Sequence, residues 1–359
     1  MKKWVKILIF ILIILVFLLI GYSLYFYNEY DRLPDRERLE TKTSGAYSYF
    51  ADDEAINAGR AYNIMTYNIG YGFTTSDYSS FEYGGKYTWA PSEELVMGNL
   101  CDIADVINKT APDFILLQNV DIDSTRSYHV NELDLVNEFL KGYYYSHATT
   151  SDTPFVMYPL YAPKGECLTS MATYSTGIIV ENLRRSLPIR DDLTKYLEPD
   201  SAYMVTRIPL ANEKSLLIYN VHLTSKDDEV KRSQLKMIFN DMELEYRLGN
   251  YIVCGGDFGY NLRMEPPVKD DNTIDIPYFP RDMIPQGFSL GIDSAFPVSV
   301  IHDSTRDAKY AYEEDVTPTV TEDGFIVSDN IMINYYNNAD WKYEYSNHDP
   351  VLMQIYVKE

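Results

Sequence analysis

The most uniform apolar stretch of the chain lies at its N-terminus. Residues 4–27 contain one charged side chain, Lys6, and the run from Ile7 to Ile20 is entirely apolar. A helix of this length spans the hydrocarbon core of a bilayer, and Lys6 lies close enough to its end to reach the interface. Aromatic residues at 22 and 25–27 follow as an interfacial belt. The pattern predicts a transmembrane signal anchor at residues 7–27.

A cleaved signal peptide is the competing interpretation, because Lys2 and Lys3 form a basic start. No small-x-small cleavage motif follows the apolar run, which favours an uncleaved anchor. Residues 1–6 are then a short basic cytoplasmic end, and the large C-terminal part lies outside. This predicts a single-pass protein of the cell membrane with an extracytoplasmic domain.

The segment behind the anchor, residues 28–60, is polar and mixes both signs of charge. It shows no periodic pattern long enough for a stable helix or strand. We therefore expect a polar stalk at 28–60, followed by one domain over 61–359.

Short apolar runs and amphipathic segments alternate along this domain. Val96, Leu100, Ile103 and Ile107 recur at spacings of four, three and four residues, which predicts a helix over 93–108. Further helices are expected over 131–140 and 229–248. Apolar runs predict strands at 62–69, 113–120, 171–180, 202–208, 215–223, 252–254, 325–333 and 351–357. Strands and helices in this order imply packed α and β layers.

Polar residues stand at or beside the ends of five of these strands: Asn68, Asn119, His222, Asp257 and His348. Two glycines precede Asp257, and they permit a sharp turn or the close approach of a ligand. Taken alone, Asp257 also suits the start of a surface turn. Strand ends gathered on one edge of a sheet form a polar cleft, however, and five such residues favour a functional site.

Composition and charge narrow the possible partners. Hydrophobic residues make up 46% of the chain, which is typical of a globular protein. The first 27 residues hold only Lys2, Lys3 and Lys6 as charges, so the rest carries 28 basic and 53 acidic side chains and a net charge of −25. Such a surface repels nucleic acid at long range but leaves room for a small phosphorylated ligand in a local cationic pocket. The three cysteines match no disulfide framework or zinc pattern.

The strand-end motifs together resemble those of the endonuclease/exonuclease/phosphatase superfamily, the fold of pancreatic deoxyribonuclease. They stand here as TYNIG, LLQNV, YNVHLTS, GGDFG, SDNIMIN and SNHDPV, and the likeness covers roughly residues 62–359. The stretch STRSYH after LLQNV is similar to bacterial membrane-anchored members. The resemblance implies an α/β (α+β) fold, a four-layer αββα sandwich of two packed β-sheets flanked by helices, here behind one N-terminal transmembrane helix.

The resemblance also implies a chemistry, metal-assisted hydrolysis of a phosphoester with Mg²⁺ or Mn²⁺. By motif position, Asp257 matches the residue that activates water and His348 the terminal catalytic histidine. His222 matches the histidine that stabilises charge on the phosphate, and Asp329 the carboxylate that orients His348.

Binding roles follow from the same motifs. Asn68 matches the first asparagine of the metal and phosphate region, and Asn220 is the neighbour of His222. Arg126 and His129, in the STRSYH stretch, are expected to bind an anionic phosphate. Asp121 lies two residues beyond Asn119, so on a continuing strand it shares that face and is a candidate metal ligand.

Three positions depart from the motifs at the reacting centre. Asn119 replaces the metal-binding glutamate, Gly259 the asparagine of GDFN, and Asn347 the aspartate of SDH. Mg²⁺ prefers anionic oxygen ligands, so the two amides weaken the expected site. Two functions therefore stay open. One is a membrane-tethered metal-dependent phosphoesterase, and the other is a catalytically silent relative, with no cofactor, that serves as an extracytoplasmic phosphate-binding or structural module.

Overall fold

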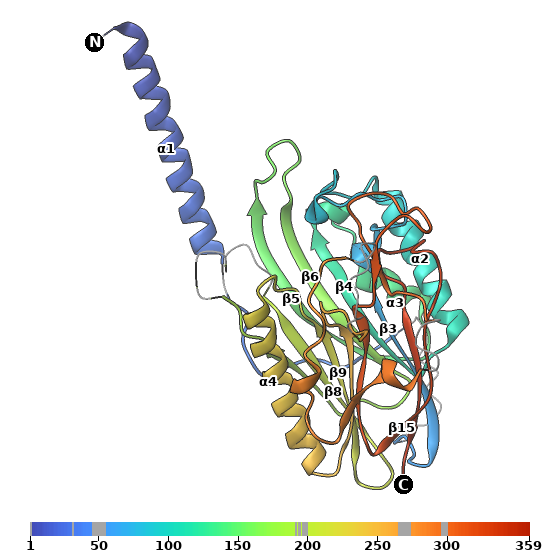
Figure 1. Ribbon diagram of the computed structural model, residues 1–359. Coiled ribbons are helices and arrows are strands. Elements are labelled where there is room, and N and C mark those ends of the chain that lie inside the picture. Colours follow the sequence, from blue (N-terminus) through green and yellow to red (C-terminus); the bar gives the residue numbers. More distant parts are fainter. Residues whose placement is uncertain are drawn as a thin grey trace.

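A long N-terminal helix stands out from a body of two packed β-sheets in the computed structural model (Figure 1). The structure describes residues 2–30, 32–44, 55–190, 192, 195, 200–264, 274–295 and 301–359. Helix α1 comprises Lys3–Glu29, α2 Glu93–Thr110, α3 Glu132–Phe139 and α4 Asp228–Arg247. Short 3-10 turns occupy Gly70–Gly72, Phe81–Tyr83, Thr125–Ser127, Arg281–Met283 and Gly291–Ser294.

Each main sheet has seven strands. The first has the order β1 (Glu37–Arg38), β7 (Glu181–Ser186), β8 (Ala202–Pro209), β9 (Ser215–His222), β10 (Tyr251–Asp257), β14 (Asp323–Ser328) and β11 (Phe288–Leu290). The second has the order β15 (Ile331–Asn338), β16 (Val351–Val357), β3 (Arg60–Asn68), β4 (Phe114–Ser124), β6 (Gly165–Ser175), β5 (Tyr144–Val156) and β2 (Lys42–Thr43). A separate ribbon pairs β12 (Thr305–Arg306) with β13 (Thr319–Val320).

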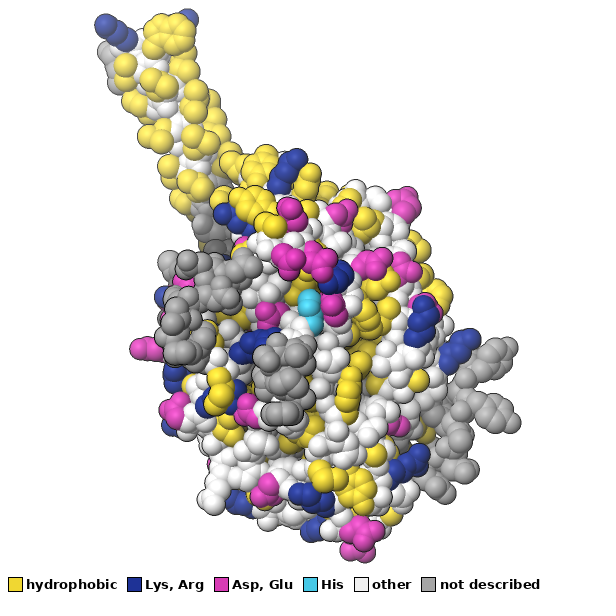
Figure 2. Space-filling view, turned by 45° about the vertical axis from the view of Figure 1, so that its right-hand side comes forward, with side chains coloured by type: hydrophobic (Ala, Val, Ile, Leu, Met, Phe, Trp, Pro, Cys, Tyr) yellow, Lys and Arg dark blue, Asp and Glu magenta, His cyan; other side chains and the backbone are white. Residues whose placement is uncertain are grey.

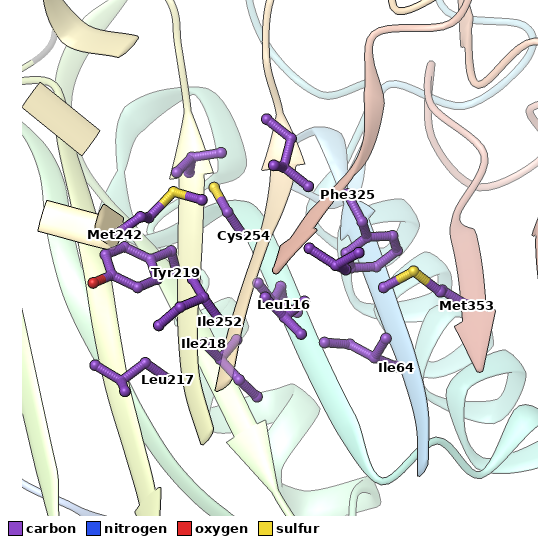
Figure 3. Close-up of a cluster of buried hydrophobic side chains, with 14 of the residues drawn as sticks. Ile64, Leu116, Leu217, Ile218, Tyr219, Met242, Ile252, Cys254, Phe325 and Met353 are labelled. Atoms are coloured by element: carbon purple, nitrogen blue, oxygen red, sulfur yellow. The ribbon is translucent and has the colours of Figure 1, made fainter. Parts of the chain in front are cut away.

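Helices cover the outer faces of this sandwich. The apolar face of α2, with Val96 and Leu100, packs with α3 on the outside of β3 and β4. Helix α4 packs on the first sheet through Leu235, Ile238 and Met242. Figure 3 shows the core, where buried side chains such as Ile64, Leu116, Ile218, Ile252 and Phe325 come from strands of both sheets. The predicted four-layer arrangement is confirmed.

Local sequence explains where the helices begin. The Ser92 hydroxyl accepts a hydrogen bond from the Leu95 amide at 3.2 Å, and two glutamates follow in the first turn of α2. The Asp227 carboxylate caps α4 in the same way, accepting from the Glu229 amide at 3.0 Å. Side-chain caps of this kind satisfy backbone N–H groups that have no partner within the helix.

Two parallel pairs bring strand ends together. In register, β10 lies beside β9 so that Asp257 is opposite His222, and β3 lies beside β4 so that Asn68 is opposite Gln118. Strand β14 is antiparallel to β10 and starts where β10 ends, with Asp323 opposite Asp257. The C-terminal ends of β3, β9 and β10, the middle of β4 and the start of β14 therefore meet on one side of the sandwich.

The single strand predicted over 325–333 is wrong. The structure has two strands there, and they belong to different sheets, since β14 ends at Ser328 and β15 begins at Ile331. The two apolar runs are separated by only Asp329 and Asn330, so the sequence pattern reads as continuous although the chain crosses between the sheets.

The stalk expected at residues 28–60 is also wrong over 32–44, while Asp31 and residues 45–54 lie outside the described residues. Strand β1 pairs with β7 at the edge of the first sheet, and β2 pairs with β5 at the edge of the second. Arg184, which is 1% exposed, donates to the carbonyls of Pro34, Thr149 and Asp200 at 2.7–3.1 Å. Backbone pairing and this buried guanidinium hold a polar segment that has no apolar pattern of its own.

Helix α1 is the one helix of the described residues that is long and apolar enough to cross a membrane, with a mean hydropathy of 3.2 in its most apolar window. A signal sequence near the N-terminus has the same properties. Its last turns contact strand β5. The Tyr22 hydroxyl donates to the Phe155 carbonyl at 3.1 Å and accepts from the Met157 amide at 2.9 Å, and the Tyr25 hydroxyl accepts from the Phe155 amide.

Candidate functional site

Asp257, the last residue of β10, lies at the centre of the cluster of strand ends. Its Oδ2 accepts a hydrogen bond from Asn68 Nδ2 at 3.0 Å and lies 3.5 Å from His222 Nε2, while Oδ1 accepts from the Gly259 amide at 2.9 Å. The preceding Gly256 has a φ of +144°, and a Cβ atom there would lie 1.9 Å from the Val221 carbonyl oxygen. Only glycine allows this approach of β10 to β9, which places Asp257 beside His222.

His348 reaches the same point from the loop before β16. Its Nδ1 donates to Asp323 Oδ2 at 2.7 Å, and its Nε2 lies 3.3 Å from Asn68 Nδ2 and 3.9 Å from Asp257 Oδ2. Ser304 and Thr305 donate to the same Asp323 oxygen at 2.8 and 3.0 Å. A carboxylate held in this way fixes the orientation of the imidazole ring.

The predicted contact between Asp329 and His348 is wrong, because Asp323 occupies that position. Asp329 lies at the opposite end of β14, about 20 Å away along the strand, and accepts a hydrogen bond from the Tyr246 hydroxyl at 2.5 Å. The signal for Asp323 is present in the sequence. It stands just before the apolar run at 325–327, and the start of an antiparallel strand lies at the same sheet edge as the ends of its neighbours.

Electrostatics differ sharply between the two histidines. Burial alone would lower the pKa of His348, but the Asp323 carboxylate, with smaller contributions from other acids, raises it to about 9. Burial lowers the pKa of His222 despite the nearby Asp257. Burial would raise the pKa of Asp257, yet the two histidines bring it below its usual range. At neutral pH the site thus holds a charged His348, a neutral His222 and an ionised Asp257.

Glu322 is a member of the site that the sequence reasoning missed. Ligand atoms of Asp257, Glu322 and His348 all lie within 4.8 Å of one another. Burial, and then the charge of Asp257, raise the pKa of Glu322 to about 8. Its carboxylate makes no hydrogen bond or ion pair within the described residues. Beyond its position next to Asp323, Glu322 has no sequence signal, because it follows the irregular ribbon β12–β13.

Asn68, the last residue of β3, is held by Asn119, which lies within β4 at its irregularity. The Asn119 Nδ2 donates to Asn68 Oδ1 at 2.9 Å, and the Gly70 amide donates to the same oxygen at 3.1 Å. Asn68 Nδ2 in turn contacts Asp257 and His348. The side chain predicted to bind metal or phosphate is therefore engaged at both ends, and it positions Asp257.

Asp121 and Arg126 form a buried ion pair away from this cluster. The guanidinium donates to both carboxylate oxygens at 2.9 and 2.8 Å and stacks on the Tyr71 ring at 3.4 Å. The predictions of Asp121 as a metal ligand and Arg126 as a phosphate ligand are contradicted by these contacts. The physical reason is an irregularity in β4 between Leu117 and Val120, with Asn119 at a φ of +55°, which breaks the alternation of faces.

The other predicted binding residues lie apart from Asp257. Asn220 is fully buried between the sheets, where its amide accepts from Gln118 and donates to the Ala172 carbonyl, so it is not available to a phosphate. His129 is exposed and pairs with Asp123. Asn347, a departing position, accepts from the Thr74 hydroxyl at 2.7 Å and is buried.

The backbone conformation explains why residue 259 is glycine and not the asparagine of the motif. It has a φ of +60°, and a Cβ atom would lie 2.4 Å from the Leu223 carbonyl oxygen. Its own carbonyl accepts from Lys231 Nζ. The asparagine of the GDFN motif therefore does not fit this loop as it stands.

Comparison with solved structures identifies the fold of the chain. No protein-family model and no curated protein matches the chain. Among solved structures, an endonuclease/exonuclease/phosphatase from Beutenbergia cavernae matches with a TM-score of 0.56 and 16% identity, covering 83% of this chain and 72% of that one. The chain has the endonuclease/exonuclease/phosphatase fold.

Other proteins of the endonuclease/exonuclease/phosphatase fold match similarly. ANGEL2, a 2′,3′-cyclic phosphatase, matches with a TM-score of 0.51 and 14% identity, covering 91% of this chain and 99% of that one. A mannosyl-6-phosphatase from Bacteroides thetaiotaomicron matches with a TM-score of 0.50 and 13% identity over 82% and 99%. These likenesses confirm the fold expected from the strand-end motifs; at such identities they carry nothing about substrate.

Proposed function

We propose that this chain is a membrane-anchored phosphoester hydrolase that depends on a divalent metal ion. The observation that carries the proposal is the convergence of Asp257, Glu322 and His348, with ligand atoms within 4.8 Å, next to the Asp323 carboxylate that orients His348. Asp257 and Glu322 are the carboxylates that would hold the ion, and His348 lies beside them with its Nε2 proton in place. Glu322 thus supplies the anionic oxygen that Asn119 lacks.

The residues present fit a divalent cation. Asp257 and Glu322 repel one another in a buried place, and this repulsion contributes to the raised pKa of Glu322. Mg²⁺ and Mn²⁺ prefer such hard oxygen ligands. When bound there, the ion would neutralise phosphoryl oxygens and acidify a water molecule.

The protein's own groups have complementary roles. Asp257 is ionised at neutral pH and accepts the proton of the attacking water. His348, charged at that pH, donates its Nε2 proton toward a phosphoryl or leaving oxygen, and Asp323 stabilises that charge. His222 lies beside Asp257 at 3.5 Å and presents its ring to the same space, while Asn68 fixes the Asp257 carboxylate.

A silent phosphate-binding module is the second candidate. It is favoured by Asn119 and Asn347, whose side chains are engaged by Asn68 and Thr74 rather than open to a metal ion. In that case His348 and His222 bind a phosphate without turning it over.

The remaining proposals concern location and partners. Helix α1 anchors the protein in the cell membrane, with the domain outside the cytoplasm. The ligand is a phosphorylated compound, and the net charge of −25 behind the anchor disfavours nucleic acid.

Thermal unfolding of the full chain in detergent tests the metal site. With Mn²⁺ at about 100 times its Kd, the Tm is expected to rise by roughly 2–5 °C. Glu322→Gln removes the rise, whereas Asp329→Asn, at the far end of β14, retains it. Hydrolysis of a generic phosphodiester and phosphomonoester with Mn²⁺, lost in Asp257→Ala, supports the enzyme.

The outcomes separate the two candidates. A chain that binds inorganic phosphate but shows neither the Mn²⁺ effect nor turnover is the silent module. Equal Mn²⁺ stabilisation of wild type and Glu322→Gln contradicts the proposed ligand set.

A further inference from the structure

The hairpin that joins β5 to β6 carries an exposed apolar surface. Residues 153–163 include no charged side chain, although 23% of the chain is charged. Leu160 is 81% exposed and Tyr161 is 73% exposed. We call the exposed side chains of this hairpin the tip surface: Phe155, Met157, Tyr158, Leu160 and Tyr161. Isolated exposed apolar residues are ordinary, but five from one hairpin form a patch that indicates a binding surface.

The tip surface is continuous with the end of α1. Tyr22 and Tyr25 bond to the backbone of Phe155 and Met157, at the base of the hairpin. Figure 1 shows the hairpin extending beyond the sheet on the side from which α1 leaves the body. Figure 2 shows hydrophobic side chains gathered where the helix meets the body.

The tip surface also borders the loop that leads to the site. The Phe81 ring packs against Tyr158 and Tyr161, with centroids 5.8 and 6.4 Å apart. The adjacent Lys164 pairs with Glu82. The same loop begins at Gly70, whose amide bonds Asn68, and Thr74 contacts Asn347. Site, loop and tip surface therefore lie on one side of the molecule.

We propose that the tip surface lies in the interface of the bilayer that α1 spans, and that the site thereby faces phosphate esters carried at the membrane surface. The first part rests on the membrane anchoring proposed above, and the second also on the proposed hydrolase. The occupant is a lipid surface for two reasons. The bonds to α1 place the hairpin at the aromatic end of the helix, where a bilayer interface would lie. Leucine, methionine and tyrosine without any charge suit insertion at the headgroup level.

Lipid quenching tests the position of the hairpin. The full chain, in a Cys101→Ser background, is labelled with an environment-sensitive fluorophore at Leu160→Cys and placed in nanodiscs of phosphatidylcholine. Leu248→Cys is the matched control, because Leu248 is 65% exposed and lies just before β10, at the end of the sheet away from Asp257. Lipids brominated in the acyl chain are expected to quench the label at 160 at least threefold more strongly than that at 248.

Each other outcome is decisive. Equal quenching at the two positions in nanodiscs that retain the protein overturns the proposal, even if α1 spans the bilayer. A label at 160 that is shielded from water but not quenched places the tip surface against protein, for example a second copy, and also overturns it. Loss of the chain from the nanodiscs refutes the anchoring and the docking together, whereas the Mn²⁺ measurement above is independent of both.

A separate measurement tests whether the site faces phosphate esters at the membrane surface. Wild type in the same nanodiscs is expected to hydrolyse a phosphodiester carried on a lipid at least tenfold faster than its water-soluble analogue. Leu160→Glu with Tyr161→Glu, which leaves the site untouched, is expected to remove this preference while turnover of the soluble analogue is unchanged. Equal rates on both substrates in the wild type overturn the second part only.

Discussion

His348 owes its charge to a residue that lies 25 positions earlier in the chain. Asp323 accepts from its Nδ1, and the attraction outweighs the burial that would otherwise keep the imidazole neutral. A group with a pKa of about 9 is charged below that pH and neutral above it, so wild-type His348 is charged at pH 7.5.

We therefore predict that Asp323→Asn lowers the pKa of His348 by about one to three pH units, so that the ring becomes largely neutral at pH 7.5. Histidine NMR resonances of the metal-free protein, titrated from pH 5 to 10 and assigned with His348→Gln, report this directly. Asp329→Asn is the control and leaves the titration in place. An unchanged titration in Asp323→Asn contradicts the pairing.

The central residues of the site could be predicted from the sequence, but the residues that surround and orient them could not. Asn68, His222, Asp257 and His348 meet as expected, because each stands at a strand terminus and termini of neighbouring strands share an edge. Asp121 does not lie at the site. Its prediction assumed that side chains alternate between the two faces of the strand, and this alternation is broken where β4 is irregular at Asn119. No pattern in one sequence marks such an irregularity beforehand.

At the level of elements, the least predictable part is the pair of short edge strands, β1 and β2. They are too short for a periodic signal and are held by partners far along the chain, among them Arg184. The long helices and the central strands were predictable, because burial imposes a period over many residues. The single strand predicted across 325–333 is wrong because one continuous apolar run in the sequence is divided in the fold between β14 and β15, which belong to different sheets.

Arg184→Met should release the edge strands without unfolding the core. Removing the guanidinium leaves the carbonyls of Pro34, Thr149 and Asp200 without this donor, so we expect amide exchange at Glu37–Arg38 to accelerate at least tenfold. Hydrogen exchange with mass spectrometry measures this, with β10 as the internal reference. Arg232→Met, which removes an exposed pair with Asp228 on α4, serves as the control variant. Equal protection in both variants would show that Arg184 does not hold the segment.

For the whole molecule, the excess of acidic side chains acts against docking on an anionic membrane. Like charges repel over about one Debye length, roughly 10 Å at 0.1 M salt. Replacing a third of the phosphatidylcholine by an anionic lipid should therefore reduce bromine quenching of the label at Leu160 at low salt, and 0.5 M NaCl should restore it. Quenching that grows with anionic lipid would contradict a role for the net charge of −25.

The attachment of residues 32–44 to both sheets also sets how far the domain can travel. Arg32 donates to the Leu187 carbonyl and the Leu33 amide to Asp200, so the body begins almost where α1 ends at Glu29. From Glu29 to Arg32 the chain can extend by about 10 Å at most. If α1 spans a bilayer, this linker is too short for the domain to move away from the membrane surface. Encounters would then be set by lateral diffusion, and a compound confined to the same plane would reach the site far more often than one dissolved at equal abundance.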